Sequence, residues 1–184
     1  MMKSPQNIND WETTEEWEDI WVSQRRYETM YNEAVDCANN KDVNGFIEKM
    51  SSLANIKKPD EENLYDISQD PKHEIVAKAQ MQLANFFLFG VKETDNGSII
   101  KTKKDLKKAV RYTKLSAENG NSSSQQNLAT MYEEGVTPDG EKLPDIKQDY
   151  KKSLKLYYLA SKQGLEVAKI DGVKLYKKMK MHND

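Results

Sequence analysis

The residues best suited to catalysis or metal binding are few in this sequence. Its two histidines are His73 and His182, and its single cysteine is Cys37. Zinc ligands are typically closely spaced His and Cys residues, and the sequence contains no His-x-x-x-His or Cys-x-x-Cys pair. Cys37 could act as a nucleophile, but its spacing places it near the apolar face of a helix, which favours a structural role. We therefore expect no metal site and no catalytic thiol.

Carboxylates are the next group that could do chemistry. Asp105 and Asp149 could form an acid–base pair, but they stand 44 residues apart at matching positions of an internal repeat. Each lies in the expected first turn of a helix, where the helix dipole favours a carboxylate. No glycine-rich loop of the phosphate-binding type occurs. The sequence therefore predicts a protein that is not an enzyme and has no cofactor. A hydrolase that uses Asp and His73 is the third alternative for function.

Aromatic side chains are the third group, since Trp and Tyr dominate the hot spots of protein interfaces. The first part of the chain holds all three tryptophans. Two interpretations stay open: these residues pack the first helix onto the second, or some remain exposed as anchors for a partner. Phe86, beside a repeat position, presents the same choice between core and surface. The candidate partner-binding residues are Trp11, Trp17, Trp21, Tyr27 and Phe86.

Charge is unevenly distributed along the chain. Residues 1–75 carry 8 Lys and Arg against 17 Asp and Glu, a net charge of −9, whereas residues 76–184 carry 20 against 13, a net charge of +7. An acidic end is better suited to binding a basic partner than to binding nucleic acid or an anionic membrane. The lysines of the last helix suit its dipole and a solvated face. We expect a protein partner, with a basic toxin or effector as one candidate, and neither nucleic acid nor a membrane.

Two observations bear on location. A single cysteine cannot form an intramolecular disulfide, so nothing indicates an oxidising compartment. The sequence before Cys37 has no basic start followed by an apolar run, and no stretch approaches the roughly 18 apolar residues of a membrane span. We therefore expect a cytoplasmic protein.

Apolar residues recur at helical spacing through most of the chain, and glycine, proline and capping residues divide it into segments. Thr102 is expected to cap the fourth helix, and no segment alternates with period two, so no sheet is expected. The expected helices cover about residues 10–37, 43–54, 71–89, 103–119, 122–134, 147–163 and 165–179. The expected organisation is a flexible N-terminus (1–10), a divergent N-terminal helix pair (11–56), a linker loop (57–70), a repeat region (71–180) and a tail (181–184).

The second half of the chain repeats itself. LANFFLFGV at 83–91 aligns with LATMYEEGV at 128–136 at an offset of 45, and DLKKAVRYTKLSAENG at 105–120 aligns with DYKKSLKLYYLASKQG at 149–164 at an offset of 44. At the same offset of 44 residues, Ser124 aligns with Ala168, so the last helix matches the first half of a third unit. Helix pairs that cannot bury their own apolar face stack into a solenoid. The sequence therefore predicts an all-α fold, an α/α superhelical solenoid of antiparallel helix pairs with about seven helices.

The repeated residues also point to a family. The pattern is Leu-small-x-x-aromatic-x-x-Gly-Val, then Asp-x-x-Lys-small, an aromatic residue, and a closing small-small-x-x-Gly. This pattern resembles the Sel-one-like repeat family, a relative of the tetratricopeptide repeats, over about residues 76–180. Alanine replaces the family's usual glycine after the leucine, and the loops within the helix pairs are longer. The anchors are Leu83, Phe87, Gly90, Val91, Asp105, Lys108, Ala109, Tyr112, Ser116, Ala117 and Gly120, then Leu128, Tyr132, Gly135, Val136, Asp149, Lys152, Ser153, Tyr157, Ala160, Ser161 and Gly164.

The resemblance implies a non-catalytic adaptor or scaffold that binds a protein partner through the solenoid surface. The alternative is a bacterial immunity protein that neutralises a cognate secreted toxin, as the resemblance implies for some members of the family. The small size and the acidic half of the chain favour this alternative. The sequence leaves open the identity of the partner, the face that binds it and the oligomeric state.

Overall fold

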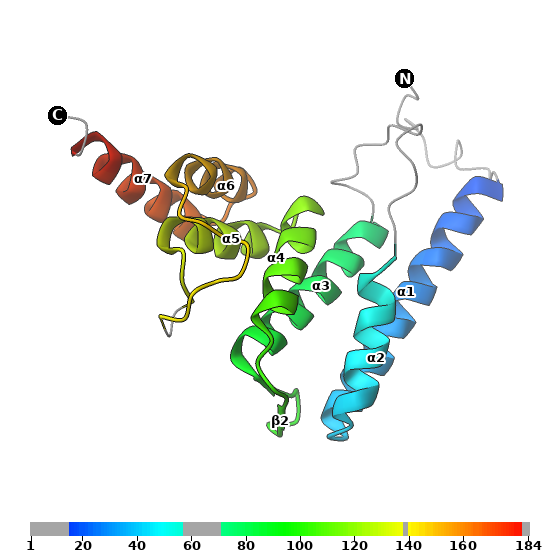
Figure 1. Cartoon of the computed structure of the whole chain (residues 1–184). Helices are drawn as coiled ribbons and strands as arrows, with labels where there is room; N and C mark the ends of the chain where they lie inside the picture. Colours follow the sequence, from blue (N-terminus) through cyan, green and yellow to red (C-terminus); the bar gives the residue numbers. More distant parts are fainter. Residues whose placement is uncertain (1–14, 57–70, 138–139, 182–184) are drawn as a thin grey trace.

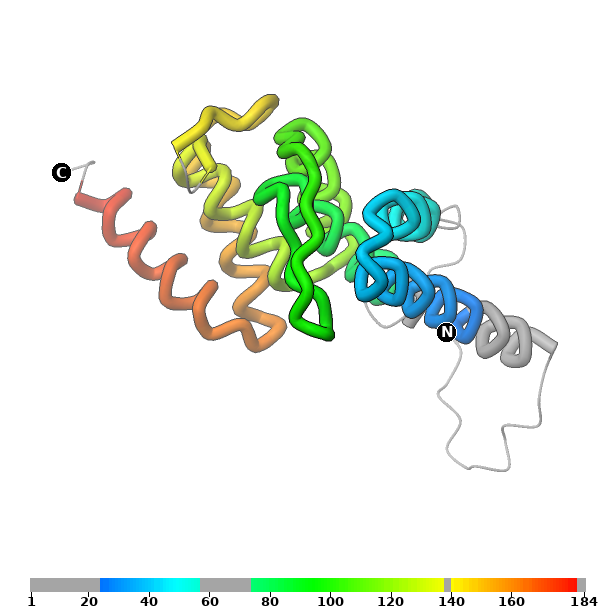
Figure 2. Tube along the Cα trace, turned by 90° about the horizontal axis from the view of Figure 1, so that it is seen from below, coloured from blue at the N-terminus to red at the C-terminus, as the bar shows by residue number. Residues whose placement is uncertain are grey.

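The helices pack one after another in chain order, from α1 and α2 at one end to α7 at the other (Figures 1 and 2). A computed structural model describes residues 15–56, 71–137 and 140–181, with the backbone alone for residues 15–23 and 71–73. Within these ranges, the expected all-α solenoid of helix pairs is confirmed. The helices are α1 (Glu15–Asn39), α2 (Val43–Ala54), α3 (Pro71–Phe89), α4 (Leu106–Glu118), α5 (Ser122–Glu134), α6 (Tyr150–Lys162) and α7 (Glu166–Met181).

In each repeat, one aspartate lies just before the second helix. The Asp105 carboxylate accepts a hydrogen bond from the Lys108 backbone N–H at 3.0 Å, and Asp149 accepts one from the Lys152 N–H at 3.0 Å. Both are therefore N-caps, which satisfy backbone donors that a helix leaves unpaired. This bond also holds the pKa of Asp149 below its ordinary value. The expectations that Thr102 caps α4 and that both aspartates lie in the first turn are therefore wrong.

A short β-hairpin between α3 and α4 corrects the expectation that the chain has no sheet. Strand β1 (Val91–Glu93) pairs antiparallel with β2 (Ile99–Lys101). The turn between the strands contains Asn96 and Gly97, and Gly97 has a φ of 75°. Glycine adopts a positive φ without steric cost and asparagine is common in turns, so the Asn-Gly pair favours a turn here. Each strand has only three residues, so the sequence shows no alternating pattern to predict it.

The loops within the helix pairs brace each unit against the one before it. Asn39 in the last turn of α1 contacts the tip of the hairpin: its side chain accepts from the Asp95 N–H at 3.1 Å, and its carbonyl accepts from Asn96 Nδ2 at 2.8 Å. In the next repeat, the Glu141 carboxylate lies 3.6 Å from the Lys104 ammonium at the base of the preceding unit. The longer loops therefore have a structural role in stacking.

Two apolar cores fill the space between the helices. The larger core joins α1 to α5, and within it Phe46 of α2 meets Phe86 of α3 edge to face, with ring centroids 5.2 Å apart. The smaller core joins α5, α6 and α7, and it contains Ala129, Tyr157 and Leu175. The last helix is thus held mainly through α6.

A buried glutamine joins three helices in each layer. Gln80 of α3 donates to the last carbonyl of α2 at 2.9 Å and accepts from Asn119, the C-cap of α4, at 2.8 Å. Gln125 of α5 donates to the Ala117 carbonyl of α4 at 3.2 Å and accepts from Gln163, the C-cap of α6, at 2.8 Å. Gln80 thus provides a donor for a carbonyl at the end of α2, and Gln125 adds a second donor to the Ala117 carbonyl, which also accepts from the Gly120 N–H at 3.1 Å. The N-terminal helix pair therefore stacks on the first repeat as the first repeat stacks on the second.

Candidate protein-binding site

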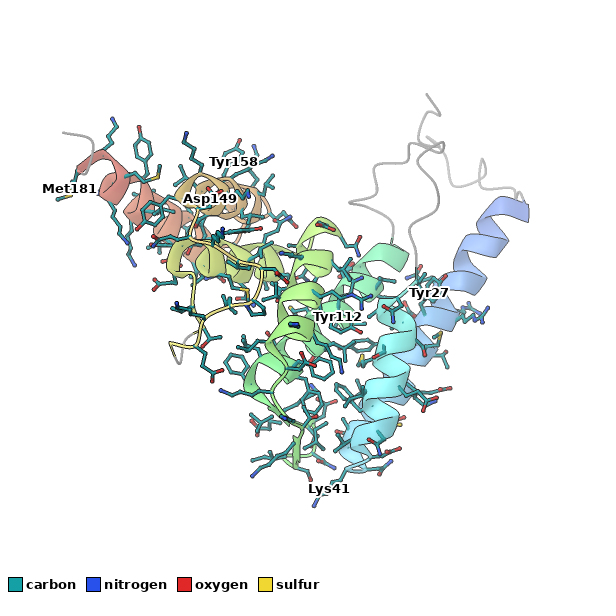
Figure 3. The ribbon with its side chains drawn as sticks, viewed as in Figure 1. Tyr27, Lys41, Tyr112, Asp149, Tyr158 and Met181 are labelled. Atoms are coloured by element: carbon teal, nitrogen blue, oxygen red, sulfur yellow. The ribbon has the colours of Figure 1, made fainter. Side chains whose placement is uncertain are left out.

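An open groove of about 610 Å³ runs between α6 and α7. Leu154 and Tyr158 line it from α6, and Val173, Tyr176 and Met179 line it from α7. Figure 3 shows Tyr158 on α6 at the end of the molecule where α7 lies. The remaining lining residues are Lys151, Lys155, Tyr157, Ser161, Ala168, Lys169 and Gly172.

Several large apolar side chains of the groove face solvent. Tyr158 is 61 % exposed, Tyr176 50 % and Val173 49 %. Single apolar residues on a surface are ordinary, whereas a contiguous apolar patch on a hollowed surface often marks an interaction site. The groove is such a patch.

The α7 wall of the groove corresponds to a surface that a helix covers one repeat earlier. At the offset of 44, Val173 of α7 corresponds to Ala129 of α5. Ala129 is fully buried, because α6 packs on α5 and places Tyr157 and Ala160 in one core cluster with it. Val173 has no such cover within the described residues, since no described helix follows α7. Among the described residues, the α7 wall of the groove is therefore an uncovered helix-packing surface.

Tyr157 forms the floor of the groove and ties α6 to α5. Its hydroxyl donates to the Glu133 carboxylate at 3.0 Å and lies 3.1 Å from the Thr130 hydroxyl. Burial is the main cause that raises the pKa of Tyr157 to about 12. Gly172 lies opposite: a Cβ at this position would come within 3.1 Å of the Tyr157 Cβ. The absence of a side chain at Gly172 thus allows α7 to lie close to α6.

The charged residues of the groove are basic. Lys151, Lys155 and Lys169 line it, and no acidic residue does so within the described ranges. Lys169 forms an exposed ion pair with Glu166 at 3.1 Å, which neutralises little because exposed pairs are weak. Among the described side chains, no carboxylate lies within ion-pair distance of Lys151 or Lys155. The groove therefore presents an apolar floor with a positive rim.

The aromatic residues predicted to bind a partner belong to the other half of the chain. Trp11 lies outside the described residues, and Trp17 and Trp21 lie in α1, where only the backbone is described. Tyr27 is partly buried against the larger core. Phe86 is 1 % exposed and packs on another buried phenylalanine, so it is a core residue. This corrects its inclusion among the partner-binding residues.

Among the other candidates for chemistry, the side chains of His73 and His182 lie outside the described residues, whereas the setting of Cys37 is described. Burial, followed by the Asp42 carboxylate, raises the pKa of the Cys37 thiol, which opposes formation of a nucleophilic thiolate. Across the described residues, no three His, Cys, Asp or Glu side chains are grouped as a metal ion would require. In the same part of the chain, no helix is both long and apolar enough to cross a membrane.

The sequence indicates the groove only indirectly. The lysines of the last helix predict a solvated face, yet Val173 repeats the buried position of Ala129 and keeps an apolar side chain. An apolar residue at a repeat position without a following helix is the signal that could have identified this surface.

Comparison with known protein families matches the same helix pairs. The family model described as Sel1 repeat matches residues 77–121, which contain most of α3, the hairpin and α4, and residues 122–165, which contain α5 and α6. Neither the comparison with curated proteins nor the comparison with solved structures found a match. Sel1 repeats are in general protein–protein interaction modules and are typically non-catalytic. Both matched segments coincide with stacked helix pairs of the structure, so residues 77–165 of this chain form two Sel1 repeats.

Proposed function

We propose that this chain is a non-catalytic adaptor or scaffold that binds a protein partner through the groove between α6 and α7. One observation carries the proposal: the groove exposes apolar side chains, and its α7 wall corresponds to a surface that a helix covers one repeat earlier. The two Sel1 repeats, which are in general protein-interaction modules, support it. We place this activity in the cytoplasm, which the single cysteine supports.

An immunity protein that neutralises a toxin is the alternative function. Its basic partner would be attracted to the acidic residues 1–75. The groove instead lies in the basic half of the chain and is lined by Lys151, Lys155 and Lys169. The groove thus favours the adaptor over the immunity protein.

Affinity purification from cells of the source organism, followed by mass spectrometry, tests the proposed function. The wild-type chain is compared with a Tyr158→Ala, Tyr176→Ala variant, which removes two exposed rings of the groove. A matched control, Phe89→Ala with Ile99→Ala, removes two equally exposed apolar side chains near the hairpin. We expect a dominant partner that the groove variant loses and the control keeps, with both variants folded by circular dichroism. Equal recovery by all three proteins, or no partner at all, would contradict the proposal.

The N-terminal tryptophans remain a proposed second anchor. A Trp17→Ala, Trp21→Ala variant in the same purification tests them, because these side chains belong to the predicted partner-binding set. Loss of the partner in this variant alone would move the binding site to the N-terminal helix pair. Retention of the partner would limit the tryptophans to a packing role.

A further inference from the structure

The shape of the groove between α6 and α7 suits a helix. Its two walls are helices, and its floor includes the small residues Ala168 and Gly172. One repeat earlier, the equivalent surface of α5 holds α6 against Ala129. An extended strand would find no unpaired backbone edge here, because the backbone groups of helix walls are already hydrogen-bonded within each helix. The equivalent packing therefore indicates a helical occupant.

The exposed apolar residues of the groove determine where a docked helix needs apolar side chains. Tyr158 on one wall and Val173 and Tyr176 on the other would be covered by apolar side chains at positions i, i+3 or i+4, and i+7 of a docked helix. In the preceding repeat, the helix that covers Ala129 of α5 is α6, which has 13 residues. A partner helix of similar length, roughly 20 Å, would fill the groove.

The charge of the groove determines which charged residues the docked helix needs beside its apolar stripe. Lys151 and Lys155 stand along one wall, and no carboxylate among the described side chains neutralises them. The α7 carboxylates Glu166 and Asp171 do not line the groove, and they lie 3.1 and 3.5 Å from lysines of the same helix. A basic helix would be repelled from such a rim, whereas acidic residues beside the apolar stripe would be attracted.

We infer that the partner presents an acidic amphipathic α-helix, which docks in the groove between α6 and α7. The inference rests on the proposed function and specifies the chemistry of the partner at that site. The apolar stripe of the helix covers Tyr158, Val173 and Tyr176, and its flanking Asp or Glu residues face Lys151 and Lys155.

A peptide based on this chain's own α6 provides the probe. It has the sequence of residues 149–164 with Lys151, Lys152, Lys155 and Lys162 replaced by glutamate, and it carries a fluorescein label. The matched control peptide keeps the four lysines, so both peptides share one apolar stripe and differ in charge alone. Fluorescence anisotropy with the full chain measures binding of each peptide. We expect the acidic peptide to bind at least about tenfold more tightly than the basic one, a difference that shrinks as salt is raised.

Variants of the full chain locate the peptide. Lys151→Glu with Lys155→Glu should weaken binding of the acidic peptide by at least about tenfold, and Val173→Asp should weaken it similarly. Lys107→Glu with Arg111→Glu changes the same two positions one repeat earlier, on α4, and should leave binding within about twofold. All of these side chains are exposed, so each variant should keep its helical circular dichroism. Equal binding to both double variants would overturn the inference.

Two further results would overturn it in distinguishable ways. If the acidic peptide fails to bind while purification still recovers a partner that the Tyr158→Ala, Tyr176→Ala variant loses, the acidic helix is wrong and the proposed function stands. If sedimentation velocity shows that the wild-type chain self-associates and that Lys151→Glu with Lys155→Glu makes it monomeric, the occupant is a second copy of this chain. An absent partner in purification would instead count against the proposed function.

Discussion

Gln125 is a single side chain that connects the ends of two helices to a third. Its amide donates to the buried end of α4 at Ala117 and accepts from Gln163. Gln125→Ala should lower the free energy of unfolding by about 1–2 kcal/mol, because its bond to the Ala117 carbonyl and its bond from the Gln163 amide are both lost. Gln126→Ala removes a neighbouring amide that makes no such bond in the described structure, so it should cost less than about 0.5 kcal/mol. Urea unfolding followed by circular dichroism measures both, and equal losses would refute the role of Gln125.

Tyr157 should make the stability of the chain depend on alkaline pH. Its pKa is about 12 in the folded chain against an ordinary value of 10.0, since burial disfavours the phenolate. Between these values the unfolded chain loses a proton that the folded chain keeps, so the stabilising contribution is complete below pH 10.0 and declines as pH rises towards about 12. The loss should approach about 2 kcal/mol.

The variant Tyr157→Phe isolates this contribution. It should be about 1 kcal/mol less stable than the wild type at neutral pH, because the bond to Glu133 is lost. Its stability should then fall less steeply between pH 10 and pH 12 than that of the wild type, as measured by urea unfolding at a series of pH values. Parallel pH curves for the two proteins would show that another group controls the alkaline loss.

At the scale of elements, the loops within the helix pairs differ in how tightly they meet the preceding helix. Gly90 and Gly135 end α3 and α5 with φ values of 69° and 74°. A Cβ at Gly90 would lie 2.8 Å from the Thr102 carbonyl oxygen, whereas at Gly135 the nearest atom, in Gln148, is 3.6 Å away. Positive φ alone costs an alanine about 1 kcal/mol. Gly135→Ala should therefore lose about 1 kcal/mol and Gly90→Ala at least about 2 kcal/mol.

Thermal unfolding of the two alanine variants provides this comparison. Because both positions share a left-handed backbone, the difference between them reports the contact with the base of the hairpin. Equal melting temperatures would mean that β2 shifts freely away from α3. That result would contradict close packing of the hairpin base on the end of α3.

The helices could be predicted from sequence, and the hairpin could not, for a physical reason. Apolar spacing, caps and terminal glycines are local signals, and the predicted span of α3 matches Pro71–Phe89. The repeat register likewise placed Asp105 and Asp149 at the start of their helices, although their side chains cap the helices from just before the first turn. A pair of three-residue strands is too short for a periodic signal, and the Asn96-Gly97 turn was its only mark.

Across the whole molecule, stability should decline towards α7. A solenoid is stabilised by contacts between neighbouring layers, and α7 packs mainly on α6 in the smaller core. Hydrogen exchange measured by mass spectrometry should therefore show lower protection for amides of α7 than for those of α3 and α4. The acidic probe peptide should raise protection in α6 and α7 alone, because a ligand stabilises the layer it binds. Uniform protection along the chain would contradict this gradient.

The sequence indicates the groove only indirectly, because the groove depends on which repeat positions are covered in the fold. Val173 and Ala129 are equivalent in sequence, and only the packing of α6 on α5 distinguishes a buried position from an exposed one. Phe86 shows the reverse case: its aromatic type suggested an anchor, and its neighbours in the fold place it in the core.

Photo-crosslinking in cells tests most directly whether the groove between α6 and α7 binds a protein. A benzoylphenylalanine crosslinker replaces Tyr158 in one variant, and in a control it replaces Lys114, the same position one repeat earlier at the offset of 44. The structure predicts one crosslinked partner at position 158 that is absent at position 114 and that disappears when Lys151→Glu and Lys155→Glu are added. The same crosslinks at both positions would contradict the assignment of the groove as the binding site. So would a third variant, with the crosslinker in place of Tyr27, if it alone captured a partner.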